Sequence, residues 1–246
     1  MLPQILERFV KCYTLFMDKA EWARANKKKI TREFFRRTTF SKSHPPIAIF
    51  MAGLPGAGKT EFTKNLLTEI AERPLRLDMD ELATLIEGYR PQTADVFRAG
   101  ASILLSRFYD EALKRGHDIV FDGTFSYEKA IDNILRAKEN HGYRVKLYLI
   151  YQDPVLAWGF TKDRELTEYR AIDRDKFIQT YFKMFQNLRM LQEEHEDVTI
   201  SVVIKDKNNR EGSREEDVED LFSCIPPLLD QHALESAIIE QDENRN

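Results

Sequence analysis

The sequence contains the stretch Gly53-Leu54-Pro55-Gly56-Ala57-Gly58-Lys59-Thr60, which fits the pattern G-x-x-x-x-G-K-[ST] in full. Glycines permit backbone angles and close approaches that a Cβ would block, so the N–H groups of such a loop can point inward around phosphates. Lys59 is then placed to reach the β- and γ-phosphates of a nucleotide, and the Thr60 hydroxyl to ligate magnesium. Residues 53–60 therefore predict a phosphate-binding loop for ATP and Mg²⁺.

The segments on either side place this loop between a strand and a helix. An apolar run, Ile47–Ala52, precedes the loop and is typical of a buried parallel strand. A helix is expected to follow, over 59–72. Further along the chain, strands expected over 75–78, 118–122, 145–151 and 198–204 alternate with helices over 93–115, 127–141 and 175–194. This alternation predicts an α/β fold with a central parallel sheet covered on both faces. Together with the phosphate loop, it predicts the three-layer αβα sandwich of P-loop kinases.

The ends of the chain differ from this core. We expect three segments: an N-terminal helical extension over residues 1–44, the kinase domain over residues 45–232, and a C-terminal tail over residues 233–246. The tail is expected to be frayed. Within the extension, an amphipathic pattern over 2–37 carries 10 Lys/Arg against 4 Asp/Glu. Its apolar face can pack on the rest of the chain, or it can offer a docking surface to an acidic partner. The sequence leaves both alternatives open.

Composition excludes several classes of protein. A net charge of −4 argues against a general nucleic-acid binder. Only two cysteines occur, which fits a reducing compartment and excludes a disulfide scaffold or a multi-cysteine zinc site. Neither a secretory signal nor a membrane-spanning stretch is predicted, so we expect a cytoplasmic protein.

Two strand ends supply carboxylates that phosphoryl transfer needs. The strand ending at Asp122 resembles a Walker B strand, and its carboxylate is a candidate to hold magnesium through water; otherwise Asp122 only starts a turn. The second strand ends in Leu77-Asp78-Met79-Asp80, where Asp80 is the candidate base for the acceptor hydroxyl. Asp80 can also be an N-cap for residues 81–87, and Asp78 is the rival base or a second metal contact.

A charged stretch, residues 162–170, follows the fourth expected strand and contains Arg164 and Arg170. Kinases bring cations onto the leaving γ-phosphoryl group, often from a mobile lid, so a lid is one interpretation. A solvated helix face with ion pairs one turn apart is the other.

The order of these motifs resembles the zeta-toxin family, P-loop kinases of bacterial toxin–antitoxin systems. The resemblance covers about Ile47 to Ile204. It is carried by the segments Val120–Phe125 and His141–Leu147, followed by Asp153-Pro154 and Arg164. It implies that Lys59 and Thr60 hold phosphate and magnesium, that Asp80 is the base and that Asp122 belongs to the metal site.

The resemblance also implies roles at the acceptor. Thr124 lies where the family contacts its acceptor, beside the aspartates Asp78 and Asp80, and Arg164 and Arg170 take the lid roles. Family members phosphorylate the amino-sugar 3′-hydroxyl of UDP-N-acetylglucosamine, and antitoxin proteins restrain them.

One segment departs from the sugar-kinase pattern. Where the family places an acidic residue in its long helix, this chain has Ser102–Arg107. Other acceptors therefore stay open: NAD, another small molecule or a nucleic-acid end. A nucleotide-binding regulator without turnover is a further alternative.

Overall fold

The computed structural model describes residues 18–70, 73–168 and 171–245. The chain forms two compact units. One, here called the helical unit, comprises Met1–Thr39 and Leu77–Arg115; the other, the sheet unit, comprises Phe40–Arg76 and Gly116–Asn246. The chain passes from the sheet unit to the helical unit within the second strand and returns after a long helix.

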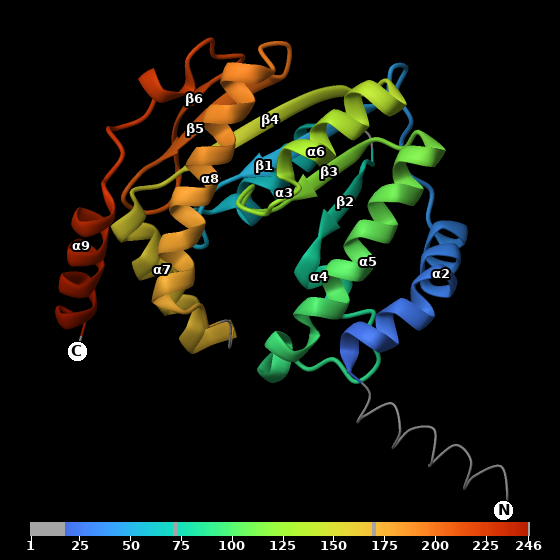
Figure 1. The fold of residues 1–246 in the computed structure, drawn as a ribbon, viewed down its shortest axis with the longest axis horizontal. Helices are drawn as coiled ribbons and strands as arrows, with labels where there is room; N and C mark the ends of the chain where they lie inside the picture. Colours follow the sequence, from blue (N-terminus) through green and yellow to red (C-terminus); the bar gives the residue numbers. More distant parts are fainter. Residues whose placement is uncertain (1–17, 71–72, 169–170, 246) are drawn as a thin grey trace, which may run out of the picture. The chain divides into compact units, whose positions relative to one another are not determined.

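Six strands form one sheet with the order β2-β3-β1-β4-β5-β6 (Figure 1). They are β1 (Ile47–Ala52), β2 (Leu75–Asp78), β3 (Ile119–Asp122), β4 (Arg144–Tyr151), β5 (Thr199–Lys205) and β6 (Glu211–Glu215). Strand β1 pairs in parallel with β3 and β4, and β4 with β5, whereas β6 is antiparallel. The carboxyl ends of β1, β3, β4 and β5 therefore open at one edge, where ligands of such sheets bind.

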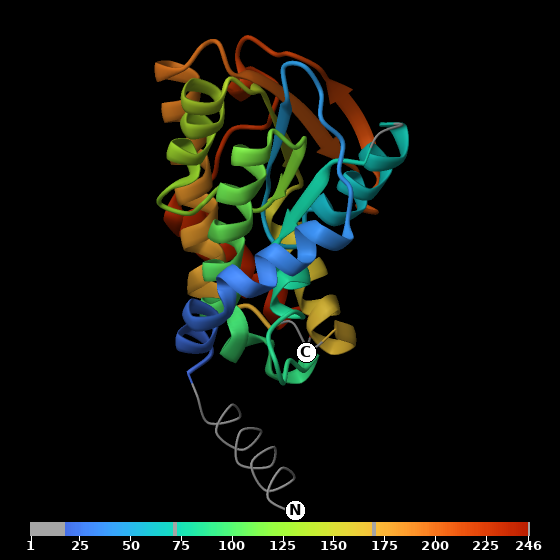
Figure 2. The same cartoon turned by 90° about the vertical axis from the view of Figure 1, so that its right-hand side faces the viewer.

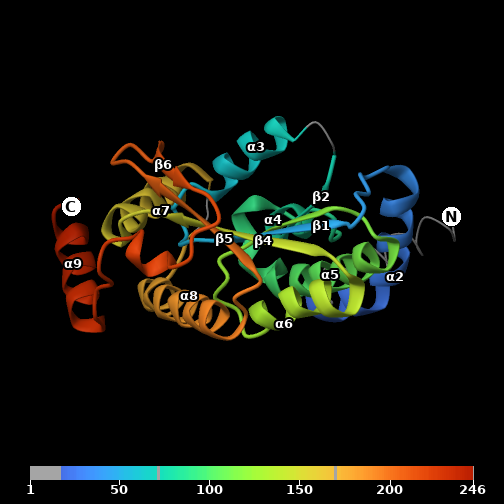
Figure 3. The ribbon, with the colours of Figure 1, turned by 90° about the horizontal axis from the view of Figure 1, so that it is seen from above.

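Helices cover both faces of the sheet in the sheet unit, with α3 on one side and α6 and α8 on the other (Figure 3). The helices of this unit are α3 (Lys59–Glu69), α6 (Ala130–Leu135) with its π-helical continuation η2 (Arg136–Asn140), α7 (Pro154–Glu168), α8 (Arg174–Glu194), the 3₁₀ turn η3 (Leu221–Ser223) and α9 (Gln231–Glu243). Six mostly parallel strands flanked by helices confirm the predicted P-loop αβα fold.

The core of the sheet unit follows the two-residue period of its strands. On one face, Phe62 and Leu66 of α3 pack on Ile49 and Met51 of β1, together with buried residues of the neighbouring strands. Phe50 points to the opposite face, where its ring stacks on that of Phe121 with centroids 5.5 Å apart. Because both faces are buried, β1 reads as an unbroken apolar run.

The helical unit contains α2 (Lys19–Arg37), α4 (Met79–Ala83), the 3₁₀ turn η1 (Pro91–Thr93) and α5 (Ala94–Arg115). Helix α2 packs obliquely across α5 (Figure 2). Trp22 and Phe35 of α2 are buried, and the Phe35 ring lies 5.8 Å from that of Phe108 on α5. Of the helical pattern predicted over 2–37, residues 2–17 lie outside the described residues.

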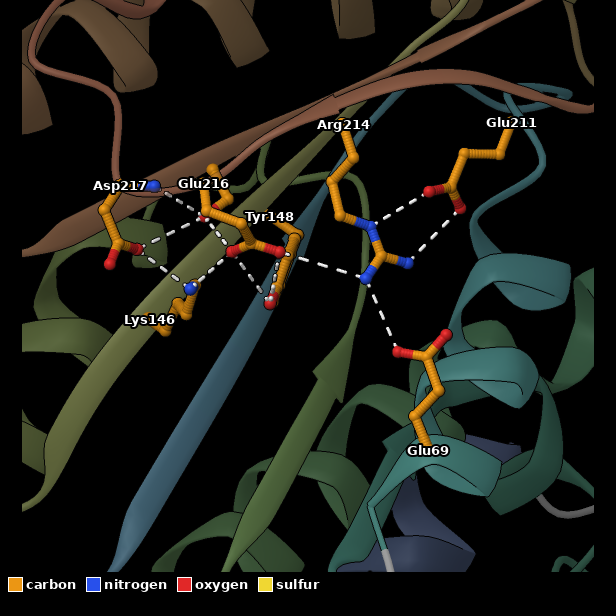
Figure 4. A network of polar contacts seen from close by, with 8 residues as sticks. Glu69, Lys146, Tyr148, Glu211, Arg214, Glu216 and Asp217 are labelled. Atoms are coloured by element: carbon orange, nitrogen blue, oxygen red, sulfur yellow. Dashed lines mark hydrogen bonds and ion pairs between the residues drawn. The ribbon is translucent and has the colours of Figure 1, made fainter.

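The sequence did not predict strand β6, which follows the strand expected over 198–204. Its sequence, Glu211-Gly212-Ser213-Arg214-Glu215, has no apolar residue, so no hydrophobic alternation announces it. Besides its backbone pairing with β5, its Arg214 forms ion pairs with Glu69 of α3 and, within β6, with Glu211 (Figure 4). The Arg214 guanidinium also lies over the Phe62 ring.

The residue after β6 joins the same network. Glu216 accepts a hydrogen bond from Lys146 of β4 at 2.6 Å (Figure 4) and another from Ser201 of β5 at 2.8 Å. Burial alone would raise the pKa of Glu216, but these hydrogen bonds hold it below its usual value. Charged side chains thus fasten this end of β6 to the parallel strands.

Helix α9 corrects the expectation that residues 233–246 are frayed. It begins after Asp230, whose carboxylate caps the Ala233 N–H, and it buries Leu234 and Ile238 completely. It packs on α7, where the indole N–H of Trp158 donates to Asp242 at 2.6 Å. The buried stripe of α9 is narrow and most of the helix is polar, so the sequence did not predict a packed helix here.

Substitutions of two adjacent isoleucines test whether α9 is part of the folded core. Ile238 is fully buried, whereas Ile239 is 41% exposed. Ile238→Ala should lower the free energy of unfolding by about 2–4 kcal/mol because it leaves a cavity. Ile239→Ala, the matched control, should change it by less than about 0.5 kcal/mol. Equal effects in urea unfolding would show that α9 is frayed in solution.

Candidate active site

The phosphate loop, residues 53–60, connects β1 to α3 as the sequence predicted. Gly56 and Gly58 have φ of 80° and 78°, in the left-handed region that favours glycine. A Cβ on Gly56 would collide with the carbonyl oxygen of Ala157 in α7. Gly58 is the N-cap of α3, so the first free N–H groups of that helix follow the loop directly. This is the backbone arrangement that binds phosphate groups.

Lys59 holds its ammonium group inside the loop. Its Nζ donates to the carbonyl oxygens of Gly53 at 2.9 Å and Leu54 at 2.7 Å. Leu54 and Ala57 are buried and anchor the loop, whereas Thr60 is exposed in the first turn of α3. A fixed cation and helical N–H groups at one place fit a polyphosphate chain.

Asp122 lies at the carboxyl end of β3, the parallel neighbour of β1, so it leaves the sheet at the same edge as the phosphate loop. Its carboxylate forms an ion pair with Arg76 of β2, with Nη2 and Oδ2 2.6 Å apart. The two side chains are only 6% and 12% exposed. The sequence did not predict Arg76, which follows a proline by two residues and belongs to a short strand.

The loop after β3 carries Thr124, whose hydroxyl lies 2.7 Å from that of Ser126. Phe125 is fully buried and has φ of 59°, an uncommon conformation for a bulky residue that is found at functional sites. Asn187 of α8 holds the strained segment: its buried amide donates to the carbonyl oxygens of Phe125 at 2.9 Å and Tyr127 at 3.3 Å. The backbone around Thr124 is therefore fixed by a residue far away in the sequence.

Asp78 and Asp80 both lie where β2 leads into α4. Asp78 is the N-cap of α4, accepting from the Asp80 N–H at 2.8 Å, so the capping role considered for Asp80 belongs to Asp78. Asp80 is exposed in the first turn of α4. Both residues belong to the helical unit, whereas the phosphate loop, Asp122 and Thr124 belong to the sheet unit.

Arg164 lies on α7, which is helical over residues 162–168, the described part of the charged stretch. It is half-buried, and its neighbours on α7 form ion pairs: Lys162 with Glu165 at 3.0 Å, and Asp163 with Arg245, which follows α9. Arg170 lies outside the described residues. The Lys162–Glu165 pair, one turn apart, is of the kind that the second interpretation expects. The amino-terminal half of α7 lies against the phosphate loop at Gly56.

The sequence did not predict Asn209 either, whose side chain contacts the phosphate loop. Asn187, Asn209 and Arg76 act through individual polar contacts to residues far away in the sequence. Such contacts have no periodicity in the sequence, and only the clustering of strand ends at one edge could have pointed to these regions.

The chain also matches a known protein family. The profile described as zeta toxin matches residues 31–215, which is most of the chain. The chain therefore belongs to the zeta toxin family, as the motifs indicated, and has the fold and phosphate loop of a P-loop kinase. A search of the curated proteins gave no significant match.

Solved structures share the fold at low sequence identity. A chain of the PezAT chromosomal toxin–antitoxin system of Streptococcus pneumoniae is 19% identical, with a TM-score of 0.64 over 90% of this chain and 96% of that one. A chain of the AvrRxo1-ORF1:-ORF2 complex is 16% identical, with a TM-score of 0.52 over 80% of this chain and 63% of that one. The same complex solved with ATP matches at 14% identity and a TM-score of 0.51. Among the helices of the described residues, none has the length and apolar character needed to cross a bilayer.

Substitution of Asp122 tests how much its ion pair with Arg76 contributes to the stability of the fold. Asp122→Asn leaves the buried Arg76 charge without this carboxylate and should lower the free energy of unfolding by about 3 kcal/mol in the absence of nucleotide and magnesium. The double variant Arg76→Met/Asp122→Asn removes the buried charge and should recover part of that loss. A single variant as stable as the wild type in chemical unfolding would contradict a structural role for this pair.

Proposed function

We propose that this protein is an ATP- and Mg²⁺-dependent kinase that transfers the γ-phosphoryl group to a hydroxyl of a nucleotide-linked metabolite. The observation that carries the proposal is the phosphate loop, with the Lys59 ammonium held by two of its carbonyl groups and Asp122 at the same sheet edge. Membership of the zeta toxin family supports it. Because it consumes ATP, we place the protein in the cytoplasm.

The proposed reaction assigns a task to each residue. The loop N–H groups and Lys59 bind the β- and γ-phosphates, and the acceptor oxygen attacks the γ-phosphorus while the bond to the leaving ADP breaks. Asp80 accepts the proton of the acceptor hydroxyl, and Asp78 and Thr124 contact the acceptor. Arg164 and Arg170 stabilise the charge that develops on the transferred group.

Thr60 and Asp122 are the residues proposed to hold Mg²⁺, which would neutralise phosphate charge when bound. The described part of the chain has no group of three or more His, Cys, Asp or Glu side chains that could form a metal site. This fits magnesium, which keeps several waters and takes phosphate oxygens in kinase sites rather than an all-protein cage.

The proposed acceptor is UDP-N-acetylglucosamine, phosphorylated at the 3′-hydroxyl of its amino sugar, so that the protein acts as a toxin. Its support is the family membership. The absence of an acidic residue in Ser102–Arg107 of α5 favours the alternative of another acceptor, such as NAD, a different small molecule or a nucleic-acid end. A regulator without turnover is the least supported alternative, because the loop carries Lys59 and Thr60 intact.

An antitoxin protein is the proposed partner, since the similar structures come from the PezAT toxin–antitoxin system and from a two-component complex. Helix α2 offers a surface of suitable charge. Its exposed residues Arg24, Lys28, Arg32 and Arg36 recur every fourth position and form one basic ridge. Its opposite face is buried, which favours the interpretation that residues 19–37 are part of the fold rather than a dispensable arm.

An acceptor screen tests the proposed function. The purified protein is incubated with ATP, Mg²⁺ and a mixture of UDP-N-acetylglucosamine, NAD and other nucleotides, and products are identified by mass spectrometry. We expect one phosphorylated product, and none with Lys59→Ala, which should keep the wild-type melting temperature. Equal product formation by the folded Lys59→Ala variant would overturn the kinase assignment.

The role of Asp80 separates catalysis from binding. Asp80→Asn should lower kcat by orders of magnitude and leave ATP affinity within a few-fold, because a base acts in the transition state. The matched comparison is Asp78→Asn, the same change at the aspartate that immediately precedes α4. A collapse of ATP binding in Asp80→Asn with magnesium present would instead make Asp80 a metal ligand and Asp78 the base.

A further inference from the structure

The connection between β5 and β6 is a tight turn built around Asp206. Its carboxylate accepts from the backbone N–H groups of Asn208 and Arg210, each at 2.8 Å. The Arg210 N–H, together with that of Asn208, holds the pKa of Asp206 below its usual value. The Asn209 N–H bonds to the Asp206 carbonyl at 2.9 Å, and Asn209 has φ of 60°, which asparagine tolerates better than most residues. The turn therefore holds Asn209 in one defined orientation.

Asn209 contacts the phosphate loop directly. Its Nδ2 donates to the carbonyl oxygen of Gly56 at 3.0 Å. A Cβ built on Gly58 would lie 2.9 Å from the Asn209 Oδ1 and 2.8 Å from the Lys205 Cε, so the turn also abuts the second glycine. One asparagine side chain thus spans the two left-handed glycines of the loop.

Gln152 fixes the orientation of the Asn209 amide. It is 3% exposed at the carboxyl end of β4, and its Nε2 donates to the Asp206 carbonyl at 2.8 Å and to the Asn209 Oδ1 at 3.4 Å. Its Oε1 accepts from the Asp153 N–H at 2.9 Å. Because Gln152 supplies a donor to Oδ1, the Nδ2 group of Asn209 faces the Gly56 carbonyl.

The peptide between Gly56 and Ala57 is consequently held at both ends. Asn209 holds its carbonyl oxygen, and its N–H, on Ala57, bonds to the Leu54 carbonyl at 3.1 Å. Glycine permits a peptide to flip, and a flip would turn a partially negative oxygen toward the phosphates. As long as Asn209 holds that oxygen, the loop presents the conformation that binds anions.

We propose that Asn209 is a positioning residue for nucleotide binding, which locks the phosphate loop from the β5–β6 turn with Gln152 as its support. This inference rests on the proposed ATP-dependent function. It predicts that loss of the Asn209 amide weakens the binding of a nucleotide more strongly when the nucleotide carries more phosphate groups. The adenosine part should bind as before.

The test is calorimetric binding of ATP and AMP, with Mg²⁺, to the full chain. Asn209→Asp keeps the size and the backbone preference but replaces the donor with a carboxylate facing a carbonyl, and Asn209→Gly removes the amide without backbone strain. We expect Asn209→Gly to weaken ATP about five- to tenfold, the loss of one hydrogen bond and of loop order, and Asn209→Asp to weaken it more. AMP affinity should change less than twofold in both.

Asn208→Asp is the matched control, because it adds the same charge at the exposed neighbouring position of the turn. It should leave the ratio of ATP to AMP affinity unchanged. Equal weakening of ATP and AMP by the Asn209 variants, or a lowered melting temperature with unchanged ATP affinity, would overturn the positioning role. Failure of the wild-type protein to bind ATP would overturn the proposed function itself, and the inference with it.

Discussion

The sheet unit depends on one close approach, that of Gly56 to the backbone of α7. No side chain fits between the phosphate loop and the Ala157 carbonyl, so α7 can pack directly on the loop. Asn209 holds the carbonyl of the same glycine from another side. The loop is therefore contacted by the segments after β4, the parallel neighbour of β1, and after β5, the parallel neighbour of β4. Packing, rather than the loop sequence alone, gives the loop its shape.

Much of the fold was readable in the sequence because each of its parts leaves a periodic or compositional signal. The apolar run of β1, the glycines of the loop and the alternation of strands and helices predicted the P-loop architecture, and β2 lies at the predicted residues. The prediction failed where burial is narrow or polar. Helix α9 buries two aliphatic residues on a polar helix, and β6 is held by backbone pairing with β5 and by the ion pair of Arg214 with Glu69 of α3.

The candidate site divides in the same way. Lys59 and Thr60 were predicted because a motif constrains their spacing, and the structure places Lys59 inside the loop. The supporting residues could not be found, since Arg76, Asn187 and Asn209 reach partners 46, 62 and 153 positions away in the sequence. A single long-range hydrogen bond imposes no pattern on its neighbours. The roles of Asp80 and Arg164 rest on the family resemblance and on the proposed reaction.

The charged composition of β6 has a consequence for association. This strand forms one edge of the sheet, and an edge strand normally offers unpaired N–H and C=O groups as a template for another chain. Here an added strand would meet Glu211, Arg214 and Glu215, of which the two glutamates are exposed. An added strand would have to desolvate these charged side chains, and a second copy of β6 would bring its own glutamates close to them. Both effects disfavour growth of the sheet at this edge. The sheet is thereby protected from ribbon-like self-assembly at the β6 edge.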